Sequence, residues 1–150
     1  KAQFATLLKS IPDASEVIFT LGEIDCREGI LVGIQKDCYD SVRQGMEATI
    51  THFAQVLPNL LKQRRMNICI HPVLPMLNET RQMVSTFNEH YRRIMQSIDM
   101  GKLHWLDFFG ELVMSPGDQA ELQLRPGFRM DGTHITPAYV YLIESAMLAR

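Results

Sequence analysis

The sequence has few cysteines and lacks the cysteine spacing of a structural zinc site or a dithiol redox site. Its three cysteines, Cys26, Cys38 and Cys69, are widely separated and form no Cys-x-x-Cys pair. We expect buried free thiols, which favours the cytoplasm or another reducing compartment, although three cysteines also allow one disulfide and one thiol. No set of histidines, cysteines and carboxylates has metal-ligand spacing, so the sequence predicts neither a metal nor a cofactor.

A long apolar run and an excess of one charge are also missing. No stretch approaches the roughly 18 to 20 apolar residues of a membrane span, and no charged start followed by an apolar core indicates a signal peptide. Lys and Arg (15) nearly balance Asp and Glu (17), which gives a formal net charge of -2. The sequence therefore predicts a soluble protein with no membrane span and no nucleic-acid partner.

Internal repeats, low-complexity tracts and a linker rich in Gly, Ser and Pro are absent too, so nothing divides the chain. Its 150 residues, 46% apolar and 21% charged, suit one domain over residues 1–150. The chain begins at Lys1 rather than at a methionine, and the first recognisable element follows almost at once. We therefore expect a partial domain from a processed or truncated polypeptide.

Three short apolar runs, two of them rich in β-branched residues, predict buried strands over 16–21, 66–70 and 103–106. His71 and Pro72 close the second run, because a proline cannot donate to a central ladder.

Apolar residues at every third or fourth position predict amphipathic helices over 37–57 and 79–98, the second capped by Asn78. A threonine and a proline at 136 and 137 open a last helix through about 148, which is apolar nearly all round and should be well buried. The sequence also predicts a short helix over 2–10 and an irregular excursion over 110–127.

Strands that alternate with helices indicate an α/β fold with a parallel sheet covered by helices. Sites in such sheets lie beyond the carboxyl ends of the strands. The segments that fall at this rim are Gly22 to Arg27, His71 to Leu77, Asp107 and Asp131 to His134.

Asp131 and His134 stand three positions apart in the short segment before the last helix. A neutral imidazole takes a proton near pH 7, and a carboxylate on its other ring nitrogen fixes the tautomer and stabilises the imidazolium. The alternative is an ordinary helix-entry loop, in which Asp131 caps a turn and His134 fills a surface position. The pair needs a nucleophile, and no serine of the chain sits on a strand-to-helix turn beside a glycine. We expect the histidines at 52, 71 and 104 to pack or cap.

Two segments resemble the SGNH or GDSL-type hydrolases, and the match runs over about residues 14–148. The segment Phe19-Thr-Leu-Gly-Glu-Ile-Asp-Cys-Arg27 resembles the family's third block, Gly-x-Asn-Asp at the end of a strand. Asp131-Gly-Thr-His134 resembles its fifth block. The resemblance implies a three-layer, flavodoxin-like parallel sheet flanked by helices, and an esterase or acyl hydrolase.

The chain departs from that family in two ways. The Gly-Asp-Ser segment with the nucleophile is absent, as is the Gly-bearing block after it, so the first strands of the fold are expected to be missing. Ile24 stands where the family places an oxyanion-hole Asn, and isoleucine cannot donate a hydrogen bond. Arg27 or a backbone N–H near Gly22 is the hypothesised substitute.

The resemblance implies a catalytic pair, with His134 as general base and Asp131 as the orienting acid. A missing N-terminal segment would supply the serine, and the substrate would be a small ester such as an acylated carbohydrate. An ordinary ion pair after a strand is the alternative for two of the substrate-binding candidates, Asp25 and Arg27. The full set of those candidates is Gly22, Glu23, Asp25 and Arg27.

Without the first strands, the strand near Glu16 to Leu21 would be an uncovered apolar edge, which native proteins avoid. We expect an upstream segment of the same polypeptide or a partner protein to cover it. The alternative function is a catalytically inactive relative that serves as a structural or protein-interaction module, which the missing nucleophile and Ile24 both favour.

Overall fold

The computed structural model describes residues 6, 9–98, 101–115, 117 and 121–150. Most of the helix predicted over 2–10 lies outside these residues. None of the described helices is long and apolar enough to cross a membrane.

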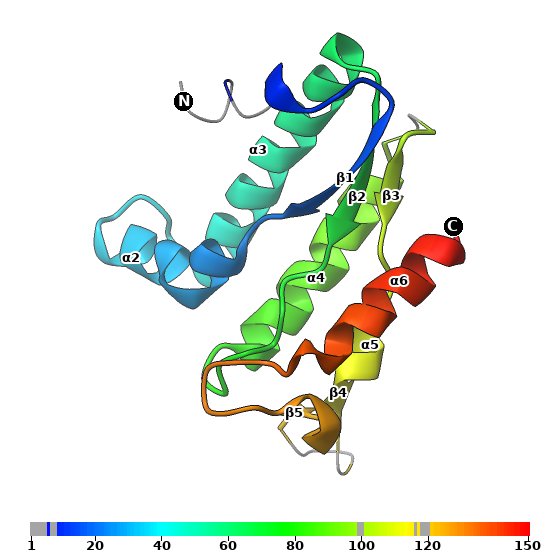
Figure 1. The fold of residues 1–150 in the computed structure, drawn as a ribbon. Helices are drawn as coiled ribbons and strands as arrows, with labels where there is room; N and C mark the ends of the chain where they lie inside the picture. The colour runs from blue at the N-terminus through cyan, green and yellow to red at the C-terminus, as the bar shows by residue number, and fades with distance from the viewer. Residues whose placement is uncertain (1–5, 7–8, 99–100, 116, 118–120) are drawn as a thin grey trace.

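The central element is a parallel sheet of three strands, β1 (Ser15–Thr20), β2 (Met66–His71) and β3 (Leu103–Trp105), in the order β1-β2-β3 (Figure 1). All three predicted strands are confirmed, within a residue or so at each end. Thr20 pairs with His71, so β1 and β2 end side by side. In the described part of the chain β1 pairs with β2 alone, which makes it an edge strand as expected.

Helices lie on both faces of this sheet (Figure 1). Successive side chains of β2 point to opposite faces. Met66, Ile68 and Ile70 join the core formed with the long helices α3 (Val42–Gln63) and α4 (Arg81–Gln96). Cys69 joins a second core with Leu142 of α6 (Val140–Leu148). A strand buried on both faces explains the nearly continuous apolar run that its sequence shows.

The first long helix begins later than predicted. Asp37 has a φ of 54°, which no right-handed helix contains, and Ser41 is the N-cap, with its side chain accepting from the backbone N–H of Gln44 at 3.2 Å. The helix also continues through Pro58 to Gln63. The expectation that Asn78 caps α4 is wrong, because Thr80 is the N-cap and Oδ1 of Asn78 accepts from Nη2 of Arg81 at 2.7 Å.

The segment after β1 is helical rather than a loop. It contains a π-helical turn η1 (Asp25–Gly29) followed by α2 (Ile30–Gln35), neither of which the sequence predicted. The backbone N–H of Cys26 donates to the carbonyl of Gly22 at 2.9 Å, so the turn starts directly at the strand end. Elements this short contain too few apolar positions for a helical period to show.

The predicted irregular excursion over 110–127 contains regular structure. It holds α5 (Phe109–Leu112), an antiparallel pair of β4 (Val113–Met114) and β5 (Gln123–Leu124), and the start of the 3-10 turn η2 (Pro126–Phe128). Each has two to four residues, below the length at which sequence periodicity is visible.

The prediction that the last helix is well buried is wrong. A 3-10 turn, η3 (Pro137–Tyr139), comes first, and within α6 only Leu142 is buried. Val140 is 45% exposed and Leu148 is 87% exposed. An apolar pattern does not reveal whether a neighbour exists to cover it.

All three cysteines are free, as one of the two sequence readings had it. Cys26 and Cys69 are buried, whereas Cys38 is exposed, which corrects the expectation that all three are buried.

Candidate functional site

The loop from Asp131 to His134 is fixed at its base by backbone contacts. Arg129 and Ile135 form an antiparallel bridge, and the N–H of Thr136 donates to the carbonyl of Phe128 at 2.9 Å. The Thr136 hydroxyl donates to the carbonyl of Gly127 at 3.1 Å, so this side chain ties the loop down rather than capping a helix. The loop therefore has a defined shape although its side chains are exposed.

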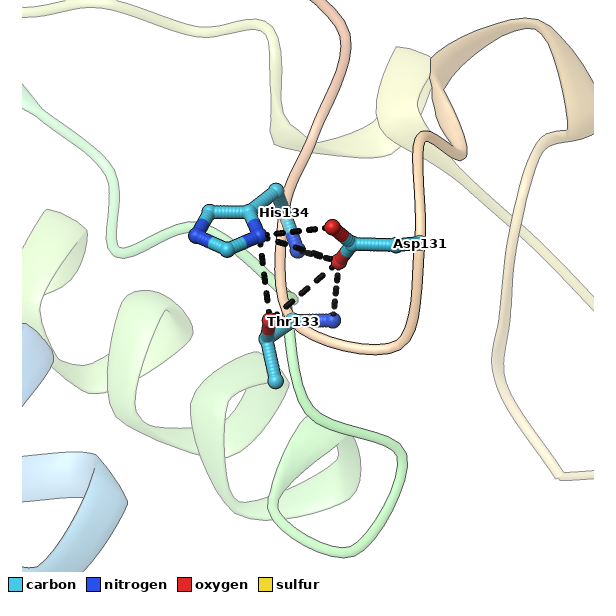
Figure 2. A network of polar contacts seen from close by, with 3 residues as sticks. All are labelled: Asp131, Thr133 and His134. Atoms are coloured by element: carbon cyan, nitrogen blue, oxygen red, sulfur yellow. Dashed lines mark hydrogen bonds and ion pairs between the residues drawn. The ribbon is translucent and has the colours of Figure 1, made fainter.

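Within this loop the Asp131 carboxylate gathers several donors (Figure 2). The backbone N–H groups of Thr133 and His134 each donate to Oδ1 at 2.7 Å, and the Thr133 hydroxyl donates to the same oxygen at 3.2 Å. The other oxygen, Oδ2, lies 2.8 Å from Nδ1 of His134. Asp131 and His134 are therefore in contact, and the features of the alternative reading, a turn capped by Asp131 and a histidine at the surface, are present as well.

The charge of Asp131 decides the tautomer of His134. Hydrogen bonds from the backbone of Thr133, first, and from the side chain of His134 lower the pKa of the Asp131 carboxyl to about 2. An ionised carboxylate only accepts, so Nδ1 of His134 carries the proton. Nε2 is then left with a lone pair, which is the state that a general base requires.

A cavity of about 500 Å³ opens at the carboxyl ends of β1 and β2, where sites in parallel sheets are expected. Gly22, Glu23 and Asp25, three of the predicted substrate-binding residues, line it. The predicted rim segment after β2 lines it as well. The complete lining is Thr20, Leu21, Gly22, Glu23, Ile24, Asp25, Phe53, His71, Pro72, Val73, Leu74, Met76 and Tyr139.

Arg27, the fourth predicted substrate-binding residue, is not in this lining. Its guanidinium lies 3.5 Å from Glu23 and 3.3 Å from Glu28, both at the exposed surface. Its nearest ionic partners are thus Glu23 and Glu28 rather than Asp25. Asp107, another residue of the predicted rim, pairs with Arg92 of α4 at 2.6 Å.

Asp131 does not line the first cavity but a second one, of about 240 Å³, together with Gly132 and Arg129. Met76 lies in the lining of both cavities. The Asp131 loop and the end of β1 are therefore brought to the same rim and are separated by the loop after β2. His134 itself is in the lining of neither cavity, and its side chain is 65% exposed.

Two residues of the first cavity that the sequence did not single out as a site are His71 and Tyr139. His71 is the last residue of β2 and is 3% exposed, and its ring meets that of Tyr139 edge-on at 6.0 Å. Tyr139 follows the Asp131 loop by a few residues and so links that loop to the cavity. The position of His71 at a strand end was the one signal that could have marked it. Among the described residues, no group of His, Cys, Asp and Glu is placed to hold a metal ion.

No protein-family model and no curated protein matches the sequence. A solved chain, described as "a putative platelet activating factor from Streptococcus pneumonia", has a similar structure with a TM-score of 0.57 over 90% of this chain, at 14% identity. This chain spans 58% of the length of that one. At such low identity the likeness shows a shared mixed α/β fold.

Proposed function

We propose that this chain is the C-terminal part of an SGNH-type ester hydrolase, with a flavodoxin-like sheet whose first strands lie outside this sequence. His134 is the general base and Asp131 orients it. The observation that supports the proposal is the contact of 2.8 Å between Nδ1 of His134 and Oδ2 of Asp131. The similar structure of a longer chain is in line with it.

The proposed reaction begins at a serine hydroxyl supplied by an upstream segment. Nε2 of His134 takes the hydroxyl proton while the serine oxygen attacks the ester carbonyl, and the carbonyl electron pair moves onto its oxygen. When that pair returns, the ester C–O bond breaks and the alcohol leaves with the proton from Nε2. Water then hydrolyses the acyl-serine by the same two proton transfers, which releases the acid and restores the serine.

The cavity at the end of β1 is the proposed place for the substrate. Gly22, Glu23 and Asp25 line it, whereas Arg27 enters the proposal as the residue that holds Glu23. Ile24 lines this cavity and is 58% exposed. Its side chain has no hydrogen-bond donor, so the proposal assigns stabilisation of the oxyanion that forms from the ester carbonyl to a backbone N–H. The substrate is proposed to be a small ester, such as an acylated carbohydrate.

The base is tested by replacing it in the full-length protein. We expect His134→Ala to abolish turnover of a small ester such as p-nitrophenyl acetate. His90→Ala removes a histidine on α4 that lies away from both cavities and should leave turnover unchanged. Equal turnover by His134→Ala and the wild type would defeat the proposal.

The origin of the serine is tested by the intact mass of the protein from its natural source, with its N-terminus read by fragmentation. An added segment of several kilodaltons that contains Gly-Asp-Ser is the expected result. A mass that matches the 150 residues would mean that a hydrolase of this type cannot be assembled from one chain.

The second candidate function is a non-catalytic relative that serves as an interaction or assembly subunit. The observation that favours it is Ile24 in the place of a hydrogen-bond donor at the cavity. Such a protein would not be labelled by a serine-directed fluorophosphonate. Labelling of the native full-length protein that His134→Ala suppresses would rule this candidate out.

The edge of β1 is the proposed position of the added strand. Ile18 pairs with Cys69 and so lies on the sheet face that α6 covers over β2, yet it is 40% exposed; the added segment is therefore proposed to cover this face of β1 as well. Ile18→Lys should then lower the stability of the full-length protein by about 2 kcal/mol. Val56 on α3 is 38% exposed, and Val56→Lys should change stability by less than about 0.5 kcal/mol. Equal effects would argue against an added segment that covers this face of β1.

A further inference from the structure

The second cavity, of about 240 Å³, differs from the first in the charge of its walls. Arg81 and Arg129 line it, whereas no lysine or arginine among the described residues lines the first cavity. Arginine presents its N–H groups in a planar fork that matches the two oxygens of a carboxylate. The second cavity is therefore the place where a negatively charged ligand would find partners.

Arg81 is a buried cation whose partners are neutral. It is 7% exposed. Its Nε donates to the carbonyl of Pro75 at 3.1 Å, Nη1 to the carbonyl of Leu122 at 3.1 Å, and Nη2 to Oδ1 of Asn78 at 2.7 Å. In the described part of the chain no carboxylate pairs with it. A buried arginine normally has an acid beside it, so this charge lacks its usual partner.

Arg129 brings a second positive charge to the same cavity. Its side chain is exposed, and its guanidinium makes no hydrogen bond or ion pair with any residue that the structure describes. Burial, first, and the charge of Arg129 lower the pKa of Arg81, while Glu79 raises it. The two like charges thus act on each other, and an anion in the cavity would be attracted by both.

The two acids of the lining do not neutralise these arginines. The Asp131 carboxylate accepts from the backbone N–H groups of Thr133 and His134 and contacts the His134 ring. Glu121 is exposed and forms no ion pair with either arginine. The acids do favour a ligand with a single negative charge over one with two, because each added charge is also repelled by them.

We propose that the second cavity binds a carboxylate group of the substrate, with Arg129 as the direct contact and the charge of Arg81 as support. Met76 lines both cavities, which makes them neighbours, and the ester part of the substrate is assigned to the first. This inference rests on the proposed function in taking the ligand to be the ester substrate. It narrows that substrate to an ester that also carries a carboxylate, and it makes Arg129 a specificity residue.

The test is a direct binding measurement, so it does not depend on catalysis. The full-length protein, labelled with ¹⁵N, is titrated with N-butylsuccinamate and with N-butyl-4-oxopentanamide. The two share one skeleton and contain no ester, and the first has a carboxylate oxygen where the second has a methyl group. The succinamate should move the Nε–H resonance of Arg129 in a saturable way and should bind at least about tenfold more tightly.

Backbone resonances report on the two cavities separately. Gly22 lines the first cavity and Gly132 lines the second. The succinamate should move the N–H resonances of both glycines, whereas acetate, which is the carboxylate without the rest of the molecule, should move that of Gly132 alone. A succinamate that moves only Gly132 would show a site for a free anion, and the assignment to the substrate would be wrong.

Variants provide the matched control, with the Gly132 resonance as the measure of binding. Arg129→Gln keeps a hydrogen-bond donor and removes the charge, so the preference for the succinamate should disappear. Arg129→Lys restores the charge without the fork and should recover part of the preference. Arg43→Gln changes the net charge equally and should leave the preference intact, because Arg43 is 79% exposed on α3, pairs with Glu47 and lines neither cavity.

Two further results would overturn the proposal. One is equal affinity for the succinamate and the oxopentanamide. The other is an equal loss of preference in Arg43→Gln and Arg129→Gln, since the effect would then be one of net charge. A carboxylate preference in a protein without ester turnover would remove the hydrolase and leave the carboxylate site standing. Ester turnover that His134→Ala abolishes, without a carboxylate preference, would remove this site alone.

Discussion

Gly22 and Phe87 are in close contact where β1 ends: a Cβ atom at Gly22 would lie 2.9 Å from Cε1 of Phe87. Gly22 also has a φ of 99°, in the region that side chains disfavour. The glycine thus lets the chain turn from β1 directly into the helical segment that carries Glu23 and Asp25. Because Gly22 packs closely against Phe87 of α4, this contact sets the distance between the helical segment and the sheet.

Gly22→Ala should destabilise the protein by about 2 to 4 kcal/mol, from the strained backbone and the overlap with a fully buried ring. Gly101 is the matched control, because its φ of 59° is also positive while a Cβ atom at this position would meet nothing within 4 Å. Gly101→Ala should cost about 1 kcal/mol. Urea unfolding measures the free energy of unfolding of both variants. An equal loss in Gly22→Ala and Gly101→Ala would show that the contact with Phe87 has no effect.

Asp131→Asn should lower kcat of the full-length protein by about ten-thousand-fold with little change in KM, if the proposed roles hold. The amide can donate to Nδ1 of His134, which moves the ring proton to Nε2 and removes the base. Thr133→Val removes only the hydroxyl that lies 3.2 Å from Oδ1 and should cost less than about tenfold. A loss below tenfold in Asp131→Asn would show that the pair is structural.

The Asp131 carboxyl should titrate well below its ordinary value. Its pKa is lowered from 3.8 to about 2, chiefly by the backbone N–H of Thr133. A carboxyl whose pKa is lower in the folded chain stabilises the folded state above its unfolded pKa, and this contribution is lost as the pH falls towards 2. The pKa of Asp131 is measured by following its side-chain ¹³C resonance with pH, and the same titration of the urea-unfolded chain is the reference. Equal midpoints in the two states would contradict the hydrogen bonds of the loop.

Of the three thiols, Cys38 alone should react quickly with iodoacetamide in the folded protein. It is exposed, whereas burial, with Asp25 and Glu23 nearby, raises the pKa of Cys26 to about 12, and burial also raises that of Cys69. Peptide mapping after brief labelling identifies the modified residue. Cys38→Ser should remove the fast reaction, and rapid modification of Cys26 would mean that η1 opens in solution.

The sequence predicted those parts of the fold that depend on local patterns. The strand run at 66–70 carries its own signal, because residues buried on both faces must be apolar. The run at 16–21 carries one too, in its β-branched and aromatic residues, although one face of β1 is exposed at Ile18. The contact between Asp131 and His134 could be predicted as well, since a spacing of three within one short loop leaves few other arrangements.

What could not be predicted depends on distant neighbours. The exposure of Val140 is one such property, because the pattern of α6 is apolar whether or not something covers it. Nε2 of His71, which has no hydrogen-bond partner among the described residues, is another, since this requires that Nδ1 be used by the adjacent carbonyl and that Phe108 and Tyr139 enclose the ring.

Met76 lies in the walls of both cavities, the one that Glu23 lines and the one that Asp131 lines. Methionine has a flexible, unbranched side chain that adopts several shapes at little cost. A substitution at this one position therefore changes the room in two cavities at once, without moving a strand or a helix.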